Sequence, residues 1–257
     1  MDIRGVLQDA IRTKTPVIFA KFGDGEFNCT QQSWGVNCDN DEYSAKKGNS
    51  LRSAFKHVVE THPNGYPGMW HGNNAIVKFW ERLVSSPVKW AEYDCINFDD
   101  LSKDSNKIDV YRAIKESPLK KIIVCNELMA KSKILLNIDH MITVPMQNWF
   151  DTQFDSTLKQ CVDAIGNDET CIIMTCCGMA GKPLIAELSK LHPKGIYIDV
   201  GSALDFICTK TDSRGKQYNY DALETFLSVL IPPGWNDPKY DDIVVKARSR
   251  CGLHLPR

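Results

Sequence analysis

The chain has 257 residues, of which 43% are hydrophobic and 25% are charged, and its formal net charge is -1. This length and composition fit one large α/β core, so we expect a single domain over residues 1–257. A net charge this close to zero gives no broad field to attract nucleic acid or an anionic membrane, which favours small, local ligands.

The first 16 residues predict an amphipathic helix. One face of this helix carries Ile3, Val6, Leu7, Ala10 and Ile11. The segment lacks the apolar core of a signal peptide, and no apolar window in the chain approaches the roughly 20 residues that a membrane helix needs. We therefore expect a soluble, cytoplasmic protein.

The ten cysteines could form disulfides, bind zinc or remain thiols. No CxxC pair is present, which disfavours zinc. Cys125, Cys171 and Cys176 lie inside apolar runs, where a thiol behaves as a small hydrophobe. The pattern favours reduced thiols in a reducing compartment.

Residues 17–22 predict a buried strand, and the acidic turn Gly-Asp-Gly-Glu follows it at residues 23–26. Two carboxylates separated by one residue in an extended turn, Asp24 and Glu26, can both face Mg²⁺ or Mn²⁺. The adjacent glycines allow a diphosphate to approach the backbone closely. The alternative is an ordinary turn in which Glu26 caps a following helix.

A polar stretch then leads to two helical patterns, over residues 50–62 and 73–86. The segment between them, residues 63–73, has too many prolines and glycines for a helix or a central strand, so we expect a loop. Its Trp70, His71 and Asn73 make it a candidate binding loop. His71 is a candidate general base, and the alternative is that it orders its own loop.

The second half of the chain alternates between apolar strand patterns and helical patterns. The strands are expected at residues 120–126, 140–145, 169–177 and 195–200, and the helices at 127–137, 148–165 and 180–192. This alternation predicts an α/β fold of Rossmann-like type, with a mainly parallel sheet covered by helices on both faces. Ligands of such sheets bind outside the carboxyl ends of the strands.

The sequence CCGMAGKP, residues 176–183, resembles a phosphate-binding P-loop but lacks its first glycine and its Ser/Thr, which are replaced by Cys176 and Pro183. It still places Gly178 and Gly181 between a strand and a helix N-terminus, where backbone N–H groups can hold a phosphate. A tight turn that needs glycine only for packing is the alternative.

The sequence YIDVGSALDF, residues 197–206, imitates the first motif of S-adenosylmethionine-dependent methyltransferases. Ala203 and Asp205 replace the later glycines of that motif, and only about fifty residues follow it. A methyltransferase is therefore an alternative interpretation, as is a metal-dependent phosphoesterase that would use the acidic turn.

The acidic block AKFGDGEF, residues 20–27, together with the late block GIYIDVGSALDF, residues 195–206, resembles the GT-D type glycosyltransferases, a family first catalogued as a domain of unknown function. The resemblance implies one Rossmann-like domain that transfers a sugar from a nucleoside diphosphate donor, usually a uridine one. It also implies that Asp24 and Glu26 serve metal and donor. Two departures from the family pattern are Lys21, where arginine is frequent, and the turn at 176–183, where a Gly-Pro-Thr-Ala type turn is common.

Our hypothesis is a Mg²⁺- or Mn²⁺-dependent hexosyl- or pentosyltransferase that moves a sugar from a UDP-sugar to a hydroxyl of a glycan acceptor, with inversion. Asp24 and Glu26 are the predicted metal ligands. Asp199, Asp205 and His71 are the candidates for the general base that inversion requires. The predicted donor-binding residues are Lys21, Phe22, Gly23, Gly25, Gly178, Met179, Gly181 and Lys182.

Overall fold

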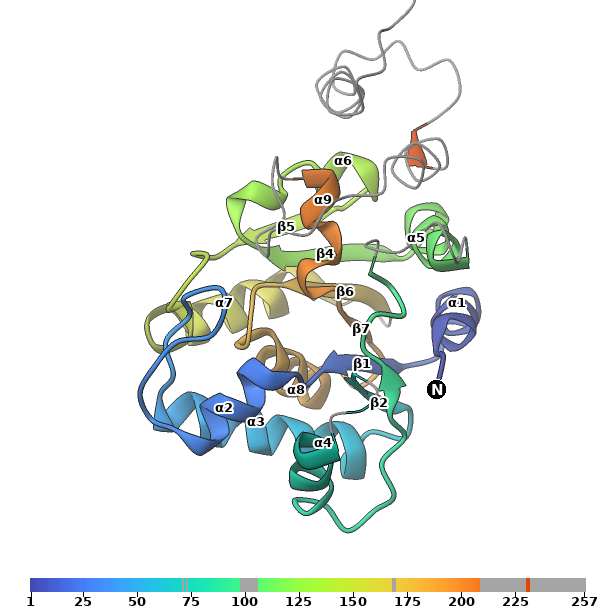
Figure 1. Ribbon diagram of the computed structural model, residues 1–257. Helices are drawn as coiled ribbons and strands as arrows, with labels where there is room; N and C mark the ends of the chain where they lie inside the picture. The colour runs from blue at the N-terminus through green and yellow to red at the C-terminus, as the bar shows by residue number, and fades with distance from the viewer. Residues whose placement is uncertain (71, 73, 98–105, 168–169, 209–229, 232–257) are drawn as a thin grey trace, which may run out of the picture.

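The computed structural model describes residues 1–70, 72, 74–97, 106–167, 170–208 and 230–231. Seven strands form one sheet, in which every neighbouring pair is parallel, in the order β3-β2-β1-β7-β6-β4-β5 (Figure 1). The strands are β1 (Val17–Lys21), β2 (Gly65–Met69), β3 (Ala91–Glu92), β4 (Lys120–Cys125), β5 (His140–Thr143), β6 (Cys171–Cys176) and β7 (Ile196–Asp199). The predicted α/β fold with a parallel sheet is confirmed.

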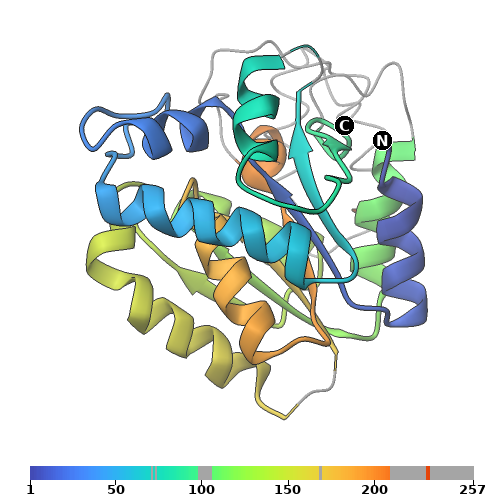
Figure 2. The same cartoon turned by 90° about the horizontal axis from the view of Figure 1, so that it is seen from below.

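Helices cover both faces of the sheet (Figure 2). One face is covered by α1 (Arg4–Thr13), α5 (Asn106–Glu116) and the short α6 (Ser132–Leu135) and α9 (Asp205–Cys208). The opposite face is covered by α2 (Asp24–Gln31), α3 (Ala45–Lys56), α4 (Asn74–Glu81), α7 (Trp149–Ile165) and α8 (Gly181–Leu191). Short helical turns are η1 (His57–Thr61), η2 (Glu127–Met129) and η3 (Gly201–Leu204).

The central strands β1, β6 and β7 are buried along their whole length because helices cover both faces of the sheet. In β1, Val17 and Phe19 face the cluster beneath α1, whereas Ile18 and Ala20 face the cluster beneath α3 and α8. All six residues of β6 are buried. Packing on both faces therefore fixes the carboxyl ends of the central strands, and with them the start of each segment that follows a strand.

The N-terminal helix has the predicted amphipathic character, with Leu7, Ala10 and Ile11 buried against the sheet. In the described part of the chain, no cysteine is in a disulfide, and all but Cys38 are buried. No helix of the described residues has the length and apolar character needed to cross a bilayer.

The prediction of a loop over residues 63–73 is wrong, because β2 lies inside the sheet between β1 and β3. The Met69 carbonyl accepts a hydrogen bond from the Tyr93 N–H, so the backbone groups of Met69 point toward β3. Backbone groups alternate sides along a strand, so those of Pro67, two residues earlier, point toward the same side. Strand β3 pairs only with Gly68 and Met69, so the missing N–H of Pro67 leaves no ladder bond unmade. Gly68 is required because a Cβ there would lie 2.9 Å from the ring of Phe19.

Two further differences concern helices. The helix predicted over residues 127–137 is divided into η2 and α6, because the Asn126 side chain accepts a hydrogen bond from the Leu128 N–H and starts a tight turn. The chain then leaves α6 through Asn137, whose φ is +53°. Helix α5 has no counterpart among the predicted elements.

Candidate functional site

A pocket of about 210 Å³ lies where the chain leaves the carboxyl ends of the strands. Its lining comes from the ends of β1 and β6 and from the segments that follow β1, β3, β4, β5, β6 and β7. The predicted site residues that line it are Lys21, Asp24, Gly25, Glu26, Gly178, Met179, Lys182 and Asp205. The fold thus brings the acidic block, the glycine-rich turn and the late block to one cavity.

The acidic block does not form the expected extended turn, because residues 24–31 are helix α2. Gly23 is the N-cap, and its N–H donates to Glu26 Oε2 at 2.9 Å, as in a capping box. Asp24 begins the helix and is exposed. Both carboxylates line the pocket, but residues two apart on a helix do not face each other, so they point in different directions.

The ammonium of Lys182 joins the two sequence blocks. Its Nζ lies 2.8 Å from Glu26 Oε1 and 3.1 Å from Asp199 Oδ2. It also donates to the carbonyl of Gly178 at 3.2 Å. An ammonium has three hydrogens, and these three acceptors use them all, so Lys182 has none left for a phosphate in this arrangement.

Lys182 remains charged although it is buried. Burial alone would lower its pKa, but the negative charges of Asp199 and Glu26 outweigh burial and hold the pKa above its ordinary value. The same Asp199 oxygen accepts the backbone N–H of Lys21 at 3.0 Å. The network therefore fixes the first turn of α2 and the end of β1 against the end of β7.

The side chain of Lys21 is buried at the pocket. Its Nζ donates to the Val200 carbonyl at 2.7 Å and lies 5.1 Å from the ring centroid of Tyr93. Burial lowers the pKa of Lys21, whereas the charge of Asp199 acts in the opposite sense. Gly201 makes room for this ammonium, since a Cβ there would lie 2.6 Å from Nζ.

The turn before α8 uses its two glycines differently. Gly178 has a φ of +70°, a conformation that favours glycine, and it lines the pocket. Gly181 packs against β6, because a Cβ there would lie 3.0 Å from Thr175 Oγ1. The N–H groups of Gly181 and Lys182 donate within the turn, to the carbonyls of Gly178 and Met179. Packing against β6 therefore explains why residue 181 is a glycine. Gly178 instead allows the backbone of the turn to line the cavity.

The candidate bases occupy different positions. Asp199 is 1% exposed and is not among the residues that line the pocket, since its carboxylate is held by Lys182 and by the backbone of Lys21. Asp205, the first residue of α9, is partly exposed and lines the pocket. His71 lies outside the described residues.

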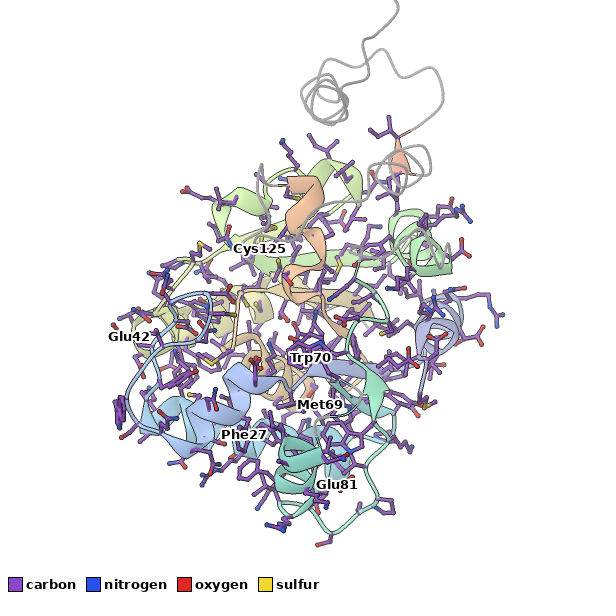
Figure 3. The ribbon with its side chains drawn as sticks, viewed as in Figure 1. Phe27, Glu42, Met69, Trp70, Glu81 and Cys125 are labelled. Carbon is purple, nitrogen blue, oxygen red and sulfur yellow. The ribbon has the colours of Figure 1, made fainter. Side chains whose placement is uncertain are left out.

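Two predicted donor-binding residues belong to the packing around the site. Phe22 is buried, with its ring centroid 5.1 Å from those of Phe55 and Trp80. Gly23 allows Trp70, which Figure 3 shows beside Met69, to come close, because a Cβ at Gly23 would lie 2.9 Å from the Trp70 ring. Neither residue lines the pocket.

Several lining residues were not predicted from the sequence. The loop between α2 and α3 contributes Asn37, Cys38, Asp39 and Asp41. The polar sequence NCDND at residues 37–41 is the signal that could have identified them, but the end of α2 and a further loop segment separate it from the acidic block. The remaining unpredicted lining residues are Tyr93, Asn126, Leu128, Met129, Met146, Cys176, Cys177, Gly201 and Ser202.

The pocket residues suit a cation that is bound partly by protein and partly by the phosphates of a ligand. They do not suit a cation bound by protein side chains alone. Among the described residues, no group of three or more His, Cys, Asp or Glu side chains is arranged to hold a metal ion. Mg²⁺ is usually bound through one or two carboxylates together with substrate phosphates. Asp24 is an exposed carboxylate in the pocket lining and fits that role.

The comparisons with known proteins match the fold but not the sequence. No family model matches the chain, and no curated protein matches it. A selenomethionine-substituted structure of domain of unknown function 1792 is similar, with a TM-score of 0.59, 16% identity and coverage of 93% of this chain and 92% of that one.

Two further solved structures carry a functional description. One, described as domain of unknown function 1792 with a distinct glycosyltransferase fold, has a TM-score of 0.57 and 14% identity, over 93% of this chain and 92% of that one. The other, described as a new glycosyltransferase from Streptococcus sanguinis, has a TM-score of 0.59 and 14% identity, over 93% and 96%. The chain therefore has the fold of these proteins, the GT-D type that the sequence resemblance implies.

Proposed function

We propose that the protein is a glycosyltransferase that moves a sugar from a UDP-sugar to a hydroxyl of a glycan acceptor, with Mg²⁺ or Mn²⁺ as cofactor. One observation carries the proposal: the acidic block and the glycine-rich turn, far apart in the sequence, line one pocket at the carboxyl edge of the sheet. Solved structures with the same fold are described as glycosyltransferases. Ligands of parallel α/β sheets bind at this edge.

The diphosphate of the donor would lie between Lys21 and the turn at Gly178. The buried Nζ of Lys21 lies at the pocket, and an ammonium there would stabilise a developing anion more strongly than one in solvent. Gly178 lets the backbone approach the phosphates closely. Departure of the diphosphate is the step that these groups would favour.

Asp24 and Glu26 remain the proposed metal-side carboxylates, with unequal roles. Asp24 would bind the cation directly, because it is exposed in the pocket lining. Glu26 would hold the helix turn that carries Asp24, because its carboxylate is fixed by the Gly23 N–H and by Lys182. When bound, the cation would neutralise charge on the leaving diphosphate.

Asp205 is the proposed general base for an inverting reaction. It lines the pocket, so its carboxylate can approach an acceptor hydroxyl and take its proton as the hydroxyl attacks the sugar. Asp199 would act as a positioning residue that orients Lys21 and Lys182.

One observation weighs against the methyltransferase alternative. There, the carboxylate after the strand would bind the ribose hydroxyls of S-adenosylmethionine. Asp199 instead accepts from Lys182 and from the Lys21 backbone and is 1% exposed.

Thermal unfolding with UDP, GDP and S-adenosylmethionine, each with Mn²⁺ and with EDTA, tests the proposal. We expect UDP with Mn²⁺ to raise the melting temperature and UDP in EDTA to raise it much less, since a ligand stabilises the state that binds it. Stabilisation by S-adenosylmethionine but not by UDP would contradict the proposal. Release of UDP from a panel of UDP-sugars, with and without candidate glycan acceptors, then identifies the reaction.

A further inference from the structure

We infer that Asp41 reads a hydroxyl of the donor sugar and helps to determine which sugar is transferred. This inference rests on the proposed function and adds a residue that lies outside both sequence blocks. Asp41 belongs to the loop that joins α2 and α3. It is 4% exposed, and it lines the pocket.

The two oxygens of the Asp41 carboxylate have different surroundings. Oδ1 accepts from Lys47 Nζ at 2.9 Å and from the Asn148 backbone N–H at 3.0 Å. Oδ2 has no hydrogen-bonding partner among the described residues. It faces Gly178, because a Cβ on that glycine would lie 3.8 Å from Oδ2. The carboxylate of Asp41 is thus largely buried, and Oδ2 is the acceptor that it leaves available to a ligand in the pocket.

The loop that carries Asp41 is held in place on both sides. Asn37 Oδ1 accepts from the backbone N–H groups of Asp39 and Asp41, at 2.9 Å each. From the segment before α7, Gln147 donates to the Asp39 carbonyl at 3.0 Å and Asn148 Oδ1 accepts the Glu42 N–H at 2.8 Å. The Asp41 carboxylate is therefore preorganised, as a specificity contact needs to be.

The position of Asp41 favours a sugar hydroxyl over a phosphate. A carboxylate repels a phosphate but accepts a hydrogen bond from a neutral hydroxyl. The ammonium of Lys47 and the backbone N–H of Asn148 both bind Oδ1, so Oδ2 is the oxygen left to accept a hydrogen bond from a ligand. The loop also meets the acidic block, since a Cβ on Gly25 would lie 3.4 Å from Asn37 Cβ. A donor whose diphosphate lies between Lys21 and the Gly178 turn would present its sugar to this loop, which borders Gly25 and Gly178.

The variant Asp41→Asn tests the inference at one atom. The Asn oxygen can replace Oδ1 and keep the hydrogen bonds from Lys47 and Asn148, which leaves an NH₂ donor where Oδ2 was. The exposed Glu42→Gln, on the same loop and outside the pocket lining, is the matched control; Figure 3 shows Glu42 near the edge of the molecule. Lys47→Met reports the cost of breaking the buried ion pair without changing a pocket residue.

The measurement is calorimetric titration of each protein, in Mn²⁺, with UDP, with a panel of UDP-hexoses, and with the deoxy analogues of the hexose that binds best. We expect Asp41→Asn to weaken the best UDP-hexose by about 10- to 100-fold, as for loss of a hydrogen bond to a charged group, with UDP affinity within about threefold. One deoxy analogue should bind the wild type and Asp41→Asn equally well, which identifies the hydroxyl. Glu42→Gln should behave as the wild type.

The outcomes separate the inference from the proposed function. If the wild type binds no UDP, the proposed function fails. If UDP and a UDP-hexose bind but Asp41→Asn weakens every deoxy analogue to the same extent, Asp41 supports the pocket without reading a hydroxyl, and the inference is overturned. The same conclusion follows if Asp41→Asn weakens UDP as much as UDP-hexose, or if Lys47→Met reproduces its effect on the best UDP-hexose at an equal melting temperature.

Discussion

The Nζ of Lys182 lies 2.8 Å from Glu26 Oε1, so a residue in the first turn of α8 neutralises a residue in the first turn of α2. The two positions are 156 residues apart in the chain. Asp199 completes the arrangement at 3.1 Å. Because Glu26 also caps α2, the pair sets the orientation of the helix turn that carries Asp24.

The two carboxylates of the acidic block should respond differently to neutralisation. Asp24→Asn should lower the free energy of unfolding by less than about 1 kcal/mol, because the residue is exposed in the first turn of a helix. It should remove the additional stabilisation that Mn²⁺ gives in the presence of UDP. Glu26→Gln should cost more, up to about 3–5 kcal/mol, because it leaves Lys182 with one fewer buried counter-charge.

Urea unfolding and thermal shift with UDP and Mn²⁺ measure both effects. Equal loss of stability in the two variants would contradict the structural assignment of Glu26. Full retention of the Mn²⁺ effect in Asp24→Asn would contradict the assignment of Asp24 as the exposed cation ligand.

Gly201→Ala should weaken UDP binding through Lys21. A Cβ at Gly201 would lie 2.6 Å from Lys21 Nζ, so the ammonium must move. Gly166→Ala is the matched control, because Gly166 also has a positive φ, +62° against +55°, but lies outside the pocket lining. Both substitutions should lower the free energy of unfolding by about 1–3 kcal/mol through backbone strain.

Calorimetric titration with UDP and Mn²⁺ distinguishes the two glycine variants. We expect at least about a tenfold loss of UDP affinity in Gly201→Ala, since a displaced ammonium forfeits a charge-assisted contact. Gly166→Ala should bind as the wild type. Equal affinities in both variants would mean that Lys21 does not contact the donor.

The strands could be predicted from the sequence where the hydrophobic pattern and the residue composition both indicate a strand. The sequences of β1, β4, β6 and β7 contain continuous apolar runs, and this pattern is characteristic of strands buried on both faces. β2 was missed because its Pro67 and glycines disfavour a central strand in general. They are tolerated here by a neighbour, β3, that pairs with only two residues of β2.

The site was predictable only in part, for a physical reason. Residues adjacent in the sequence, such as Asp24 and Glu26, can be identified by their spacing, but the partner that decides their roles is distant. Nothing in the local sequence relates Lys182 to Glu26, or Asp41 to Gly178. These relationships arise because parallel strands bring their carboxyl ends to one edge, and that edge is formed only in the folded chain.

Stability should fall as the pH decreases below the ordinary histidine pKa of 6.5. Burial lowers the pKa of both His57 and His62. The unfolded chain therefore binds protons at a higher pH than the folded chain does, so these residues reduce stability between 6.5 and their folded pKa values. His57→Gln, whose amide can still hydrogen-bond to Ser189 Oγ as His57 Nε2 does at 2.7 Å, should flatten this decrease.

Urea unfolding at a series of pH values from 5 to 8 tests the effect of His57. His140→Gln is the control, because it removes an exposed histidine outside the core. An unaltered slope below pH 6.5 in His57→Gln would show that this histidine is not responsible.

The last prediction separates the two aspartates of the late block. Asp205→Asn should lower sugar transfer by about 10²- to 10⁴-fold, as expected for loss of a general base, while UDP affinity stays within about threefold. Asp199→Asn should instead lower the melting temperature, because Asp199 is buried against Lys182 and accepts the Lys21 backbone N–H. A transfer assay and calorimetric titration on the same preparations measure both. If Asp205→Asn keeps full transfer activity, the base lies elsewhere, and His71→Gln becomes the next variant to assay. If Asp199→Asn loses transfer at an unchanged melting temperature, Asp199 takes part in the reaction despite its burial.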